Sequence, residues 1–364
     1  MTQEPKIFPY IERLLQGAEV VWKPLGEIAE IKRGQRVTKL ELSNDKQYPV
    51  YSGGVKPMGY YDAYNQEANT ITIVKYGTAG YVNFITERFW ANDVCYCIKP
   101  HTILENKYLL YVLKDMQVYI NSLATDAIPA HLPAPSLASI QIPLPPLSVQ
   151  QEIVRILDKF TQLEAELEAE LDCRKRQYEY YRNKLLISFD ESAVQWLTLD
   201  NIYKFQYGIG NKIPTIGGDY PVYGSNGIVG THSEYNSEDA PVIGHIGAYA
   251  GIINWAKGKH FVTYNGIICK KINDNVNAKY AYYLLLLQNF IDKANKASQP
   301  FISYDVLNRC IVPIPPLEEQ NRIVAILDKF DTLVNSISEG LPKEIALRRK
   351  QYEYYRERLL SFPS

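Results

Sequence analysis

The sequence has few cysteines, no long apolar run and almost no net charge. The cysteines are Cys95, Cys97, Cys173, Cys269 and Cys310. They are odd in number and lack a paired Cys-x-x-Cys spacing, so we expect buried free thiols of a reducing compartment, not disulfides or a structural zinc site. The longest apolar run, near 280–287, is too short to span a membrane and the N-terminus lacks a signal-peptide pattern, so we expect a cytoplasmic protein. A net charge of −1 argues against a simple basic DNA-coating protein, without excluding a DNA reader whose partner supplies positive charge.

Motifs of catalytic, metal and cofactor sites are also missing. An amino-methyltransferase holds an extruded base with Asn or Asp before Pro-Pro-Tyr/Phe, whereas the Pro-Pro pairs here follow Leu144 and Ile314. The segment Gly208–Gly210 lacks the third glycine of a dinucleotide loop, and no Walker-type phosphate loop occurs. The histidines His101, His232 and His260 are isolated in the sequence. We therefore expect no catalytic residue, no metal and no cofactor, in a chain that is not itself an enzyme.

The main positive feature is an internal repeat. A proline-rich segment, an apolar segment and a tyrosine-rich segment each occur twice, in the same order. The first copies are 143–147, 153–160 and 177–182, and the second copies are 313–317, 323–330 and 351–356. Because the residues between the copies differ, the repeat indicates two related units on a common frame.

Each copy of the repeat predicts a long helix. Apolar residues recur at steps of three and four from Ser148 to about residue 187. In the second copy 21 positions separate Phe330 from Gln351, against 17 from Phe160 to Gln177, and we expect a break near 340–342, at Gly340-Leu341-Pro342. Helices of roughly 60 Å are too long to be buried by one small domain, so we expect an antiparallel coiled coil. The residues expected in the coil or against a partner are Ile153, Leu157, Phe160, Leu163, Leu167, Leu171, Tyr178, Tyr181, Ile323, Leu327, Phe330, Tyr352 and Tyr355.

The segments between the helices read as globular domains of the α+β class. They contain short alternating strands with Gly, Asn and Asp turns and one helix each, near 107–116 and 279–290, so we expect a mainly antiparallel or irregular sheet. Tyr10–Leu15 nearly equals Tyr355–Leu360, which predicts a closed pseudo-two-fold frame with neighbouring termini. The expected parts are an N-terminal segment at 1–20, globular domains at 21–146 and 190–316, a central helix at 147–189 and a C-terminal helix at 317–364.

These features resemble the specificity (S) subunit of type I restriction–modification systems, over essentially the whole chain. The resemblance is carried by the Trp-x-x-Leu segments at Trp22 and Trp196, the Pro-x-Pro-Pro-Leu helix starts, the duplicated Ile-Val-x-Ile-Leu-Asp-Lys-Phe, and Arg348–Arg356 with its altered copy Arg174–Arg182. It implies that each globule is a target-recognition domain for one half of an asymmetric bipartite site in double-stranded DNA. It also implies that the helices set the gap and dock two DNA methyltransferase (modification) subunits, and that restriction (motor-nuclease) subunits join through the complex.

Candidate DNA contacts are loop residues with hydrogen-bond donors or ring faces. Arg and Lys pair with guanine edges or phosphates, and Gln and Asn with adenine edges. The candidates in the first globule are Lys32, Arg33, Gln35, Arg36, Ser52, Lys75, Tyr76, Thr78 and His131. Those in the second are Gln206, Tyr207, Asn211, Lys212, Ser225, Asn226, His245, Tyr249, Phe301 and Ser303. The alternative for each set is an ordinary solvated or glycine-marked turn.

One helical segment repeats at a finer scale. Leu163–Glu166 is followed directly by the same four-residue pattern at Leu167–Glu170, and each pattern adds about 6 Å of helix. We hypothesise that deleting one pattern shortens the recognised gap and leaves both half-sites unchanged. Two other functions stay open: a coiled-coil scaffold protein without DNA reading, which predicts no salt-sensitive DNA binding, and a stand-alone DNA methyltransferase, which the missing motifs disfavour.

Overall fold

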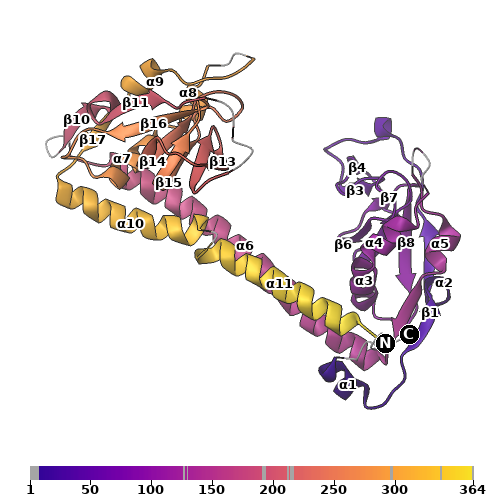
Figure 1. Cartoon of the computed structure of the whole chain (residues 1–364). Coiled ribbons are helices and arrows are strands. Elements are labelled where there is room, and N and C mark those ends of the chain that lie inside the picture. Colours follow the sequence, from indigo (N-terminus) through magenta and orange to yellow (C-terminus); the bar gives the residue numbers. More distant parts are fainter. Residues whose placement is uncertain are drawn as a thin grey trace. The chain divides into compact units, whose positions relative to one another are not determined.

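The computed structural model divides the chain into two compact units, which are described separately. Its described residues are 8–125, 128, 130–190, 194–210, 213, 217–295, 298–336 and 338–362. Unit 1 comprises Met1–Leu167 and Ile345–Ser364, and unit 2 comprises Glu168–Glu344. The long helix α6, Leu147–Ile187, is shared between them (Figure 1). Among the described residues no helix is both long and apolar enough to cross a membrane.

Unit 1 contains a four-stranded antiparallel sheet in the order β2-β8-β5-β6 and a three-stranded sheet in the order β4-β3-β7. The strands are β1 Val21–Pro24, β2 Ala29–Arg33, β3 Tyr48–Tyr51, β4 Tyr60–Tyr61, β5 Thr70–Val74, β6 Val82–Ile85, β7 Trp90–Ala91, β8 Cys95–Pro100 and β9 Gln141–Leu144. The helices are α1 Pro9–Leu15, α2 Leu25–Ile28, α3 Asn106–Asp115, α4 Gln117–Ser122 and α5 Ala134–Ala138, with the 3-10 turn η1 Lys39–Glu41. The core joins α3 to β2, β5 and β8 and to the first turns of α6.

Unit 2 repeats this plan with one continuous six-stranded sheet, in the order β11-β16-β14-β15-β12-β13. The strands are β10 Gln195–Thr198, β11 Tyr203–Tyr207, β12 Tyr220–Gly224, β13 Gly227–His232, β14 Ser237–Gly244, β15 Ile253–Val262, β16 Gly266–Lys271 and β17 Ile311–Ile314. The helices are α7 Ala278–Leu287, α8 Phe290–Lys293, α9 Tyr304–Asn308 and α10 Leu317–Asn335, with the 3-10 turn η3 Leu199–Asn201.

The sheets confirm the α+β expectation, with one difference between the units. The single strand β15 pairs antiparallel with β14 and parallel with β12, which makes one sheet. In unit 1 the same two roles are divided between β6, which pairs with β5, and β7, which pairs parallel with β3. The interruption between Ile85 and Trp90 therefore splits the sheet of unit 1 into two.

A buried glutamine joins each globule to its long helix. The Gln150 Nε2 donates to the carbonyls of Pro145 (2.8 Å) and Ile103 (3.1 Å), and its Oε1 accepts from Glu105 N (2.8 Å), at the start of α3. In unit 2 Gln320 makes the same three bonds, to Pro315 O, Asn275 O and Asn277 N. Both side chains are fully buried. This joint fixes the direction in which α6 and α10 leave their globules.

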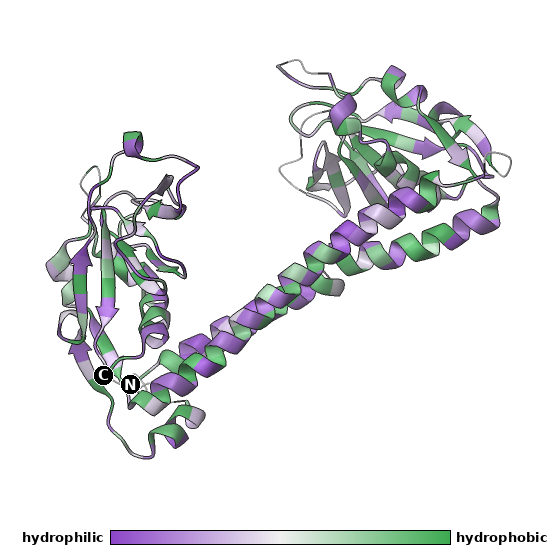
Figure 2. Cartoon of the chain, turned by 180° about the vertical axis from the view of Figure 1, so that it is seen from behind, coloured by the Kyte–Doolittle hydropathy of each residue, from purple (hydrophilic) through white to green (hydrophobic). Residues whose placement is uncertain are grey.

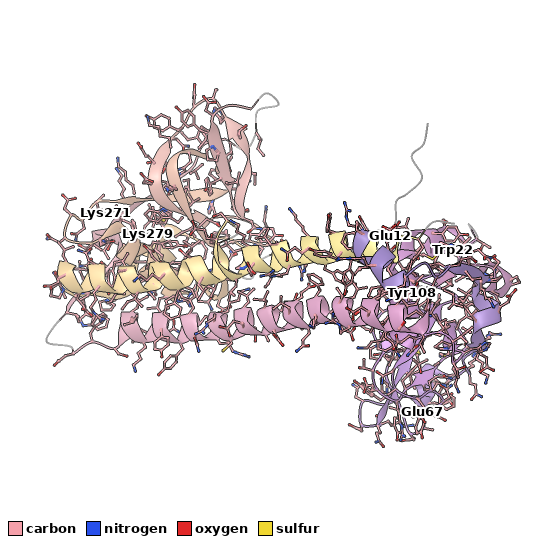
Figure 3. All side chains as sticks on the ribbon, turned by 90° about the horizontal axis from the view of Figure 1, so that it is seen from below. Glu12, Trp22, Glu67, Tyr108, Lys271 and Lys279 are labelled. Atoms are coloured by element: carbon pink, nitrogen blue, oxygen red, sulfur yellow. The ribbon has the colours of Figure 1, made fainter. Side chains whose placement is uncertain are left out.

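A second pair of hydrogen bonds ties the globules to the same helices. The Tyr111 hydroxyl on α3 donates to Asp158 on α6 (2.6 Å), and the Tyr283 hydroxyl on α7 donates to Asp328 on α10 (2.5 Å). The Tyr108 hydroxyl donates to Pro143 O, as Tyr280 does to Pro313 O, both at 3.0 Å. Tyr108 lies near the first turns of α6, with which it shares a core (Figure 3).

The long helices pack through aromatic and aliphatic side chains within each unit. In unit 1 helix α11, Gly340–Leu360, lies against the first part of α6, where Tyr355 stacks on Phe160 and Arg349 pairs with Glu164 (2.5 Å). In unit 2 α10 lies against the second part of α6, where Tyr181 stacks on Phe330. Ile153, Leu157, Ile323 and Leu327 are fully buried, Tyr178 is buried, Phe160, Leu163, Leu167, Leu171, Phe330, Tyr352 and Tyr355 are half-buried, and Tyr181 is 43% exposed. Hydrophilic and hydrophobic residues alternate along these helices (Figure 2).

The helical break precedes the segment where the sequence suggested it. Helix α10 ends at Asn335 and α11 begins at Gly340, so 340–342 form the first turn of the new helix. Gly340 has φ +74°, and a Cβ there would lie 2.4 Å from Thr332 O, so only glycine turns the chain here. The repeat also predicted neighbouring ends: Ile11 and Leu15 of α1 share one core with Leu359 and Leu360 of α11.

The cysteine expectation holds in part. All five are free, and Cys95, Cys97 and Cys269 are buried, with the pKa of Cys95 and Cys97 raised to about 12 by burial. The expectation is wrong for Cys173 and Cys310, which are half-exposed. Cys173 lies on α6, where only one helix face packs, and Cys310 lies in the turn before β17.

Candidate nucleic-acid interface

In unit 1 the candidate segments meet at one end of the four-stranded sheet. Because β2 and β5 both run antiparallel to β8, the last residues of β2 and β5 lie beside the first residues of β8: Arg33 opposes Tyr96 and Val74 opposes Cys95. The loops that follow β2 and β5 therefore leave the sheet at the same end. Helix α2 and strand β1 precede the opposite end of β2.

Arg33 is held at this end by an ion pair. Its Nε donates to Asp93 O (2.7 Å) and its Nη2 lies 3.1 Å from Asp93 Oδ2. The next residue, Gly34, passes so close to the chain that a Cβ would lie 2.2 Å from Asn92 O. Gln35 binds through its backbone, donating to Ala91 O and accepting from Trp90 Nε1, while its side chain and Arg36 are exposed. Arg33 is thus oriented, and remains about half exposed.

Tyr76, His131 and Lys75 form a second group at the same sheet end. The Tyr76 and His131 rings stack with centroids 5.6 Å apart and planes 27° apart. Lys75 Nζ lies 4.9 Å from the Tyr76 ring centroid, and the His131 Nδ1 lies 2.8 Å from Thr125 Oγ1. The group presents a cation and two half-buried rings.

Hydrogen bonds to backbone carbonyls join the loops that carry the two groups. Thr78 donates to Gly53 O through both its N (3.1 Å) and its Oγ1 (3.0 Å). The Ser52 carbonyl accepts from Cys95 Sγ, and Lys75 N donates to Val94 O. The sequence predicted these loops as separate candidates, and the structure brings them together around residues 92–95.

In unit 2 the equivalent place holds a stack of rings. Tyr207, the last residue of β11, lies 4.2 Å from His245 and 4.2 Å from Tyr304 between ring centroids, at interplanar angles of 26° and 16°. Tyr264 lies against both Tyr207 (5.7 Å) and His245 (5.2 Å). The Tyr304 hydroxyl accepts from Tyr207 N (2.7 Å).

The backbones around the two groups are equivalent. Gly208 N donates to Gly266 O as Gly34 N donates to Cys95 O, and Thr263 N donates to Tyr223 O as Asn92 N donates to Tyr51 O. A Cβ on Gly208 would lie 2.2 Å from Thr263 O, matching Gly34. Tyr207 thus stands where unit 1 has Arg33, and Tyr264 where unit 1 has Asp93.

Burial sets the charge of the unit 2 group. Burial lowers the pKa of His245 below its usual value, partly offset by the Tyr264 carbonyl 3.2 Å from its Nδ1. Burial likewise raises the pKa of Tyr207 and Tyr304. The stack is therefore uncharged near pH 7, whereas the unit 1 group contains Lys75 and the Arg33–Asp93 pair.

The remaining unit 2 candidates divide into four sets. Ser225 lies near the stack, because a Cβ on Gly244, the residue before His245, would lie 2.5 Å from Ser225 O. The backbone of Phe301 forms an isolated β-bridge with Ile246, as that of His131 does with Tyr76. The Phe301 side chain is 41% exposed, and Ser303 immediately precedes α9. Asn226 and Tyr249 are exposed, and Asn211 and Lys212 lie outside the described residues.

Lys32 and Gln206 are not part of these groups. Successive side chains of a strand point to opposite faces, so each lies on the other face of its strand from Arg33 or Tyr207. Lys32 pairs with Glu30 (2.9 Å), and Gln206 lines a separate cavity of about 600 Å³ with Tyr203 and Lys270. Both remain predictions as DNA contacts.

Sequence reasoning missed Asp93 and Tyr264, and it named Tyr304 only as the last residue of the candidate segment 300–304. Asp93 and Tyr264 follow the two carbonyls that crowd Gly34 and Gly208, so aligning the repeat through these loops was the signal that could have found them. Among the described residues no group of three or more His, Cys, Asp or Glu side chains is arranged to hold a metal ion.

Known proteins share this sequence and fold. The family model for the type I restriction modification DNA specificity domain matches residues 18–172 and 209–347. A putative type I restriction enzyme specificity subunit of Haemophilus influenzae is 34% identical over 97% of this chain and 98% of its own. The EcoR124I/EcoR124II specificity subunit of Escherichia coli is 34% identical over 97% of each chain.

A solved structure supports the fold independently. The S subunit of the type I restriction–modification system of M. genitalium superposes with a TM-score of 0.67, at 21% identity, over 96% of this chain and 98% of its own. The two matched specificity segments, the duplicated helices and the similar proteins all indicate the same family. The chain therefore belongs to the type I restriction–modification DNA specificity family, whose members are the DNA-recognising, non-catalytic subunits of these systems.

Proposed function

We propose that each unit reads one half of an asymmetric bipartite DNA site through the loops at the end of its sheet. Cluster 1 is defined as Arg33, Lys75, Tyr76, Asp93 and His131, and cluster 2 as Tyr207, His245, Tyr264 and Tyr304. The reading domains span 21–146 and 190–316. The exposed loop residues around each cluster complete the reading surface.

The observation that carries this proposal is the difference between equivalent positions. The two loop backbones share their hydrogen bonds and their crowded glycines, while Arg33 and Asp93 in one correspond to Tyr207 and Tyr264 in the other. Two loops with the same backbone and different side chains at equivalent positions suit the recognition of two different base sequences. An oriented guanidinium pairs with guanine or phosphate, whereas uncharged rings contact bases through their faces and edges.

We further propose that the long helices set the gap between the half-sites and dock two DNA methyltransferase subunits. Restriction subunits join through that complex. A protein that reads chromosomal DNA works where the chromosome lies, so we place it in the cytoplasm.

The test is the motif of modified bases in host DNA, read with and without this chain. Arg33→Ala should change or abolish recognition of one half-site, and Tyr207→Ala of the other half-site only. Lys99→Ala is the matched control, because Lys99 is exposed near the far end of β8. A motif that stays unchanged in both cluster variants would contradict the proposal.

Salt dependence tests the scaffold alternative. A DNA reader loses affinity as the salt concentration rises, because phosphate contacts release counterions. A scaffold that only pairs proteins would show no such binding.

A further inference from the structure

Each unit carries the same column of aromatic side chains on its long helices. In unit 1 Phe160 stacks on Tyr355 (5.4 Å between centroids, 27°), Tyr355 contacts Tyr354 edge to face (5.3 Å, 83°), and Arg358 lies 4.3 Å from the Tyr354 ring centroid. We define Phe160, Tyr355, Tyr354 and Arg358 as column 1. The column runs from the coiled-coil seam outward to a cation.

Column 2 has the same geometry in unit 2. Phe330 stacks on Tyr181 (5.9 Å, 25°), Tyr181 contacts Tyr180 edge to face (5.3 Å, 77°), and Lys184 lies 6.0 Å from the Tyr180 ring centroid. We define Phe330, Tyr181, Tyr180 and Lys184 as column 2. The two columns are built from equivalent residues of the repeat, with Lys184 in place of Arg358.

The inner and outer rings of each column have different environments. Phe160, Phe330 and Tyr355 are half-buried in the seam. Tyr181 is 43% exposed but stacks on Phe330, so packing accounts for the inner rings. The outer rings do not pack in this way: Tyr354 is 49% exposed and Tyr180 is 60% exposed. Among the described residues neither outer hydroxyl makes a hydrogen bond. The coiled coil therefore gives no structural reason for a tyrosine at these two positions.

The duplication indicates what the outer rings contact. Clusters 1 and 2 differ in their side chains, as two readers of different half-sites should. The columns are the same, so each contacts the same kind of surface. Duplex DNA offers no apolar pocket for an aromatic ring without unstacking its bases, whereas protein interfaces are enriched in Tyr and Arg anchors of this kind.

We propose that Tyr354 and Tyr180 are the anchors for two copies of one protein partner, the methyltransferase subunit, one on each unit. The partner offers an apolar pocket for the ring and a carboxylate for the cation beside it. This inference rests on the proposed function, and it assigns docking to two defined points on the helices.

Stoichiometry of the purified complex tests the inference. The methyltransferase subunit is co-expressed with the full chain, and the mass of the complex is measured. Two copies per chain are expected for the unchanged chain, one for Tyr180→Ala or Tyr354→Ala, and none for the double variant. The affinity of the altered position should fall about 30-fold, equivalent to about 2 kcal/mol.

Two sets of variants separate docking from a folding defect. Tyr180→Phe and Tyr354→Phe keep the ring and should keep both copies. Glu179→Ala and Glu353→Ala change exposed neighbours on another side of the helix and should also keep both copies. Because the outer rings are exposed, Tyr180→Ala and Tyr354→Ala should leave the melting temperature of the isolated chain unchanged.

DNA binding by the chain alone distinguishes this inference from the proposed function. Salt-sensitive binding of each half-site should be unchanged in the double variant. If the double variant keeps both methyltransferase copies, the inference is wrong. It is equally wrong if DNA binding falls while the stoichiometry stays at two, because the columns would then contact DNA. An unchanged chain that binds no methyltransferase overturns this inference and the proposed docking role of the helices, but leaves half-site reading standing. Cluster variants that keep both half-sites and both methyltransferase copies contradict the reading proposal alone.

Discussion

Tyr207 stacks on His245 with ring centroids 4.2 Å apart, where unit 1 has the two cations Arg33 and Lys75. Two cations at these positions repel each other, so each needs its own partner. In unit 1 Arg33 pairs with Asp93, and Lys75 lies beside the Tyr76 ring. The same backbone thus accommodates an uncharged stack in one unit and separated cations in the other.

Tyr304→Phe should weaken unit 2 while leaving the stacked rings in place. The change removes the acceptor of Tyr207 N, and an unpaired backbone donor costs about 1–2 kcal/mol. We expect a lower urea midpoint for unfolding and altered reading of the second half-site only. For the urea midpoint alone, Tyr249→Phe is the control, because the exposed Tyr249 ring lies outside the stack. Equal midpoints for both variants would argue against a role for the hydroxyl.

The buried glutamines should be the most sensitive positions of the helix joints. Gln150→Ala and Gln320→Ala each remove three hydrogen bonds from a fully buried amide, so we expect each to lower the free energy of unfolding by roughly 2–4 kcal/mol. Gln151→Ala, at an exposed neighbour, should change it by less than about 0.5 kcal/mol. Urea denaturation of the three variants measures this, and similar values for Gln150 and Gln151 would contradict the joint.

Acid should destabilise the chain through two histidines of unit 2. Burial lowers the folded-state pKa of His245 and His260 below the ordinary value of 6.5. The neutral form is favoured by folding, so the stability is complete above pH 6.5 and is lost as the pH falls through 6.5 toward the lowered pKa. The Glu152 carboxyl, whose pKa is lowered to about 2 by Arg155 and Tyr10, titrates well below this window.

The measurement is the melting temperature between pH 7.5 and pH 5.5. The unchanged chain should melt lower at pH 5.5, and the variant with His245→Gln and His260→Gln should lose less on acidification. His101→Gln, at an exposed histidine of unit 1, should leave the pH dependence unchanged. An identical pH dependence in the double variant would rule out these two histidines as its source.

Deleting Leu163–Glu166 should shorten the gap in the recognised sequence by about one or two base pairs. Four residues are about one helical turn, or about 6 Å, and a base pair occupies about 3.4 Å. Leu163 and Leu167 are half-buried, and Leu167 takes the place of Leu163 after the deletion. The modified-base motif of the variant should keep both half-sites. A gap of unchanged length would sink the hypothesis.

The sequence determined the frame of this protein. Helical periodicity, prolines and repeated tyrosines are local signals, so they predicted α6 to within one residue of its start and the burial of Ile153, Leu157, Ile323 and Leu327. Gln150 and Gln320 could be recognised in the sequence only as a repeated residue, because two of the three hydrogen bonds of each reach residues more than 40 positions away.

Tertiary structure decided which candidates lie together. The loops at Arg33, Ser52, Lys75 and His131 are far apart in the sequence, and only the antiparallel pairing of β2, β8 and β5 brings them to one sheet end. It also added Asp93 and Tyr264 and stacked Tyr304 on Tyr207. Strand alternation places Lys32 and Gln206 on the opposite strand face from Arg33 and Tyr207. A linear pattern specifies which face of an element is apolar, whereas the neighbours of a loop residue depend on the register of strands that the chain pairs over long distances.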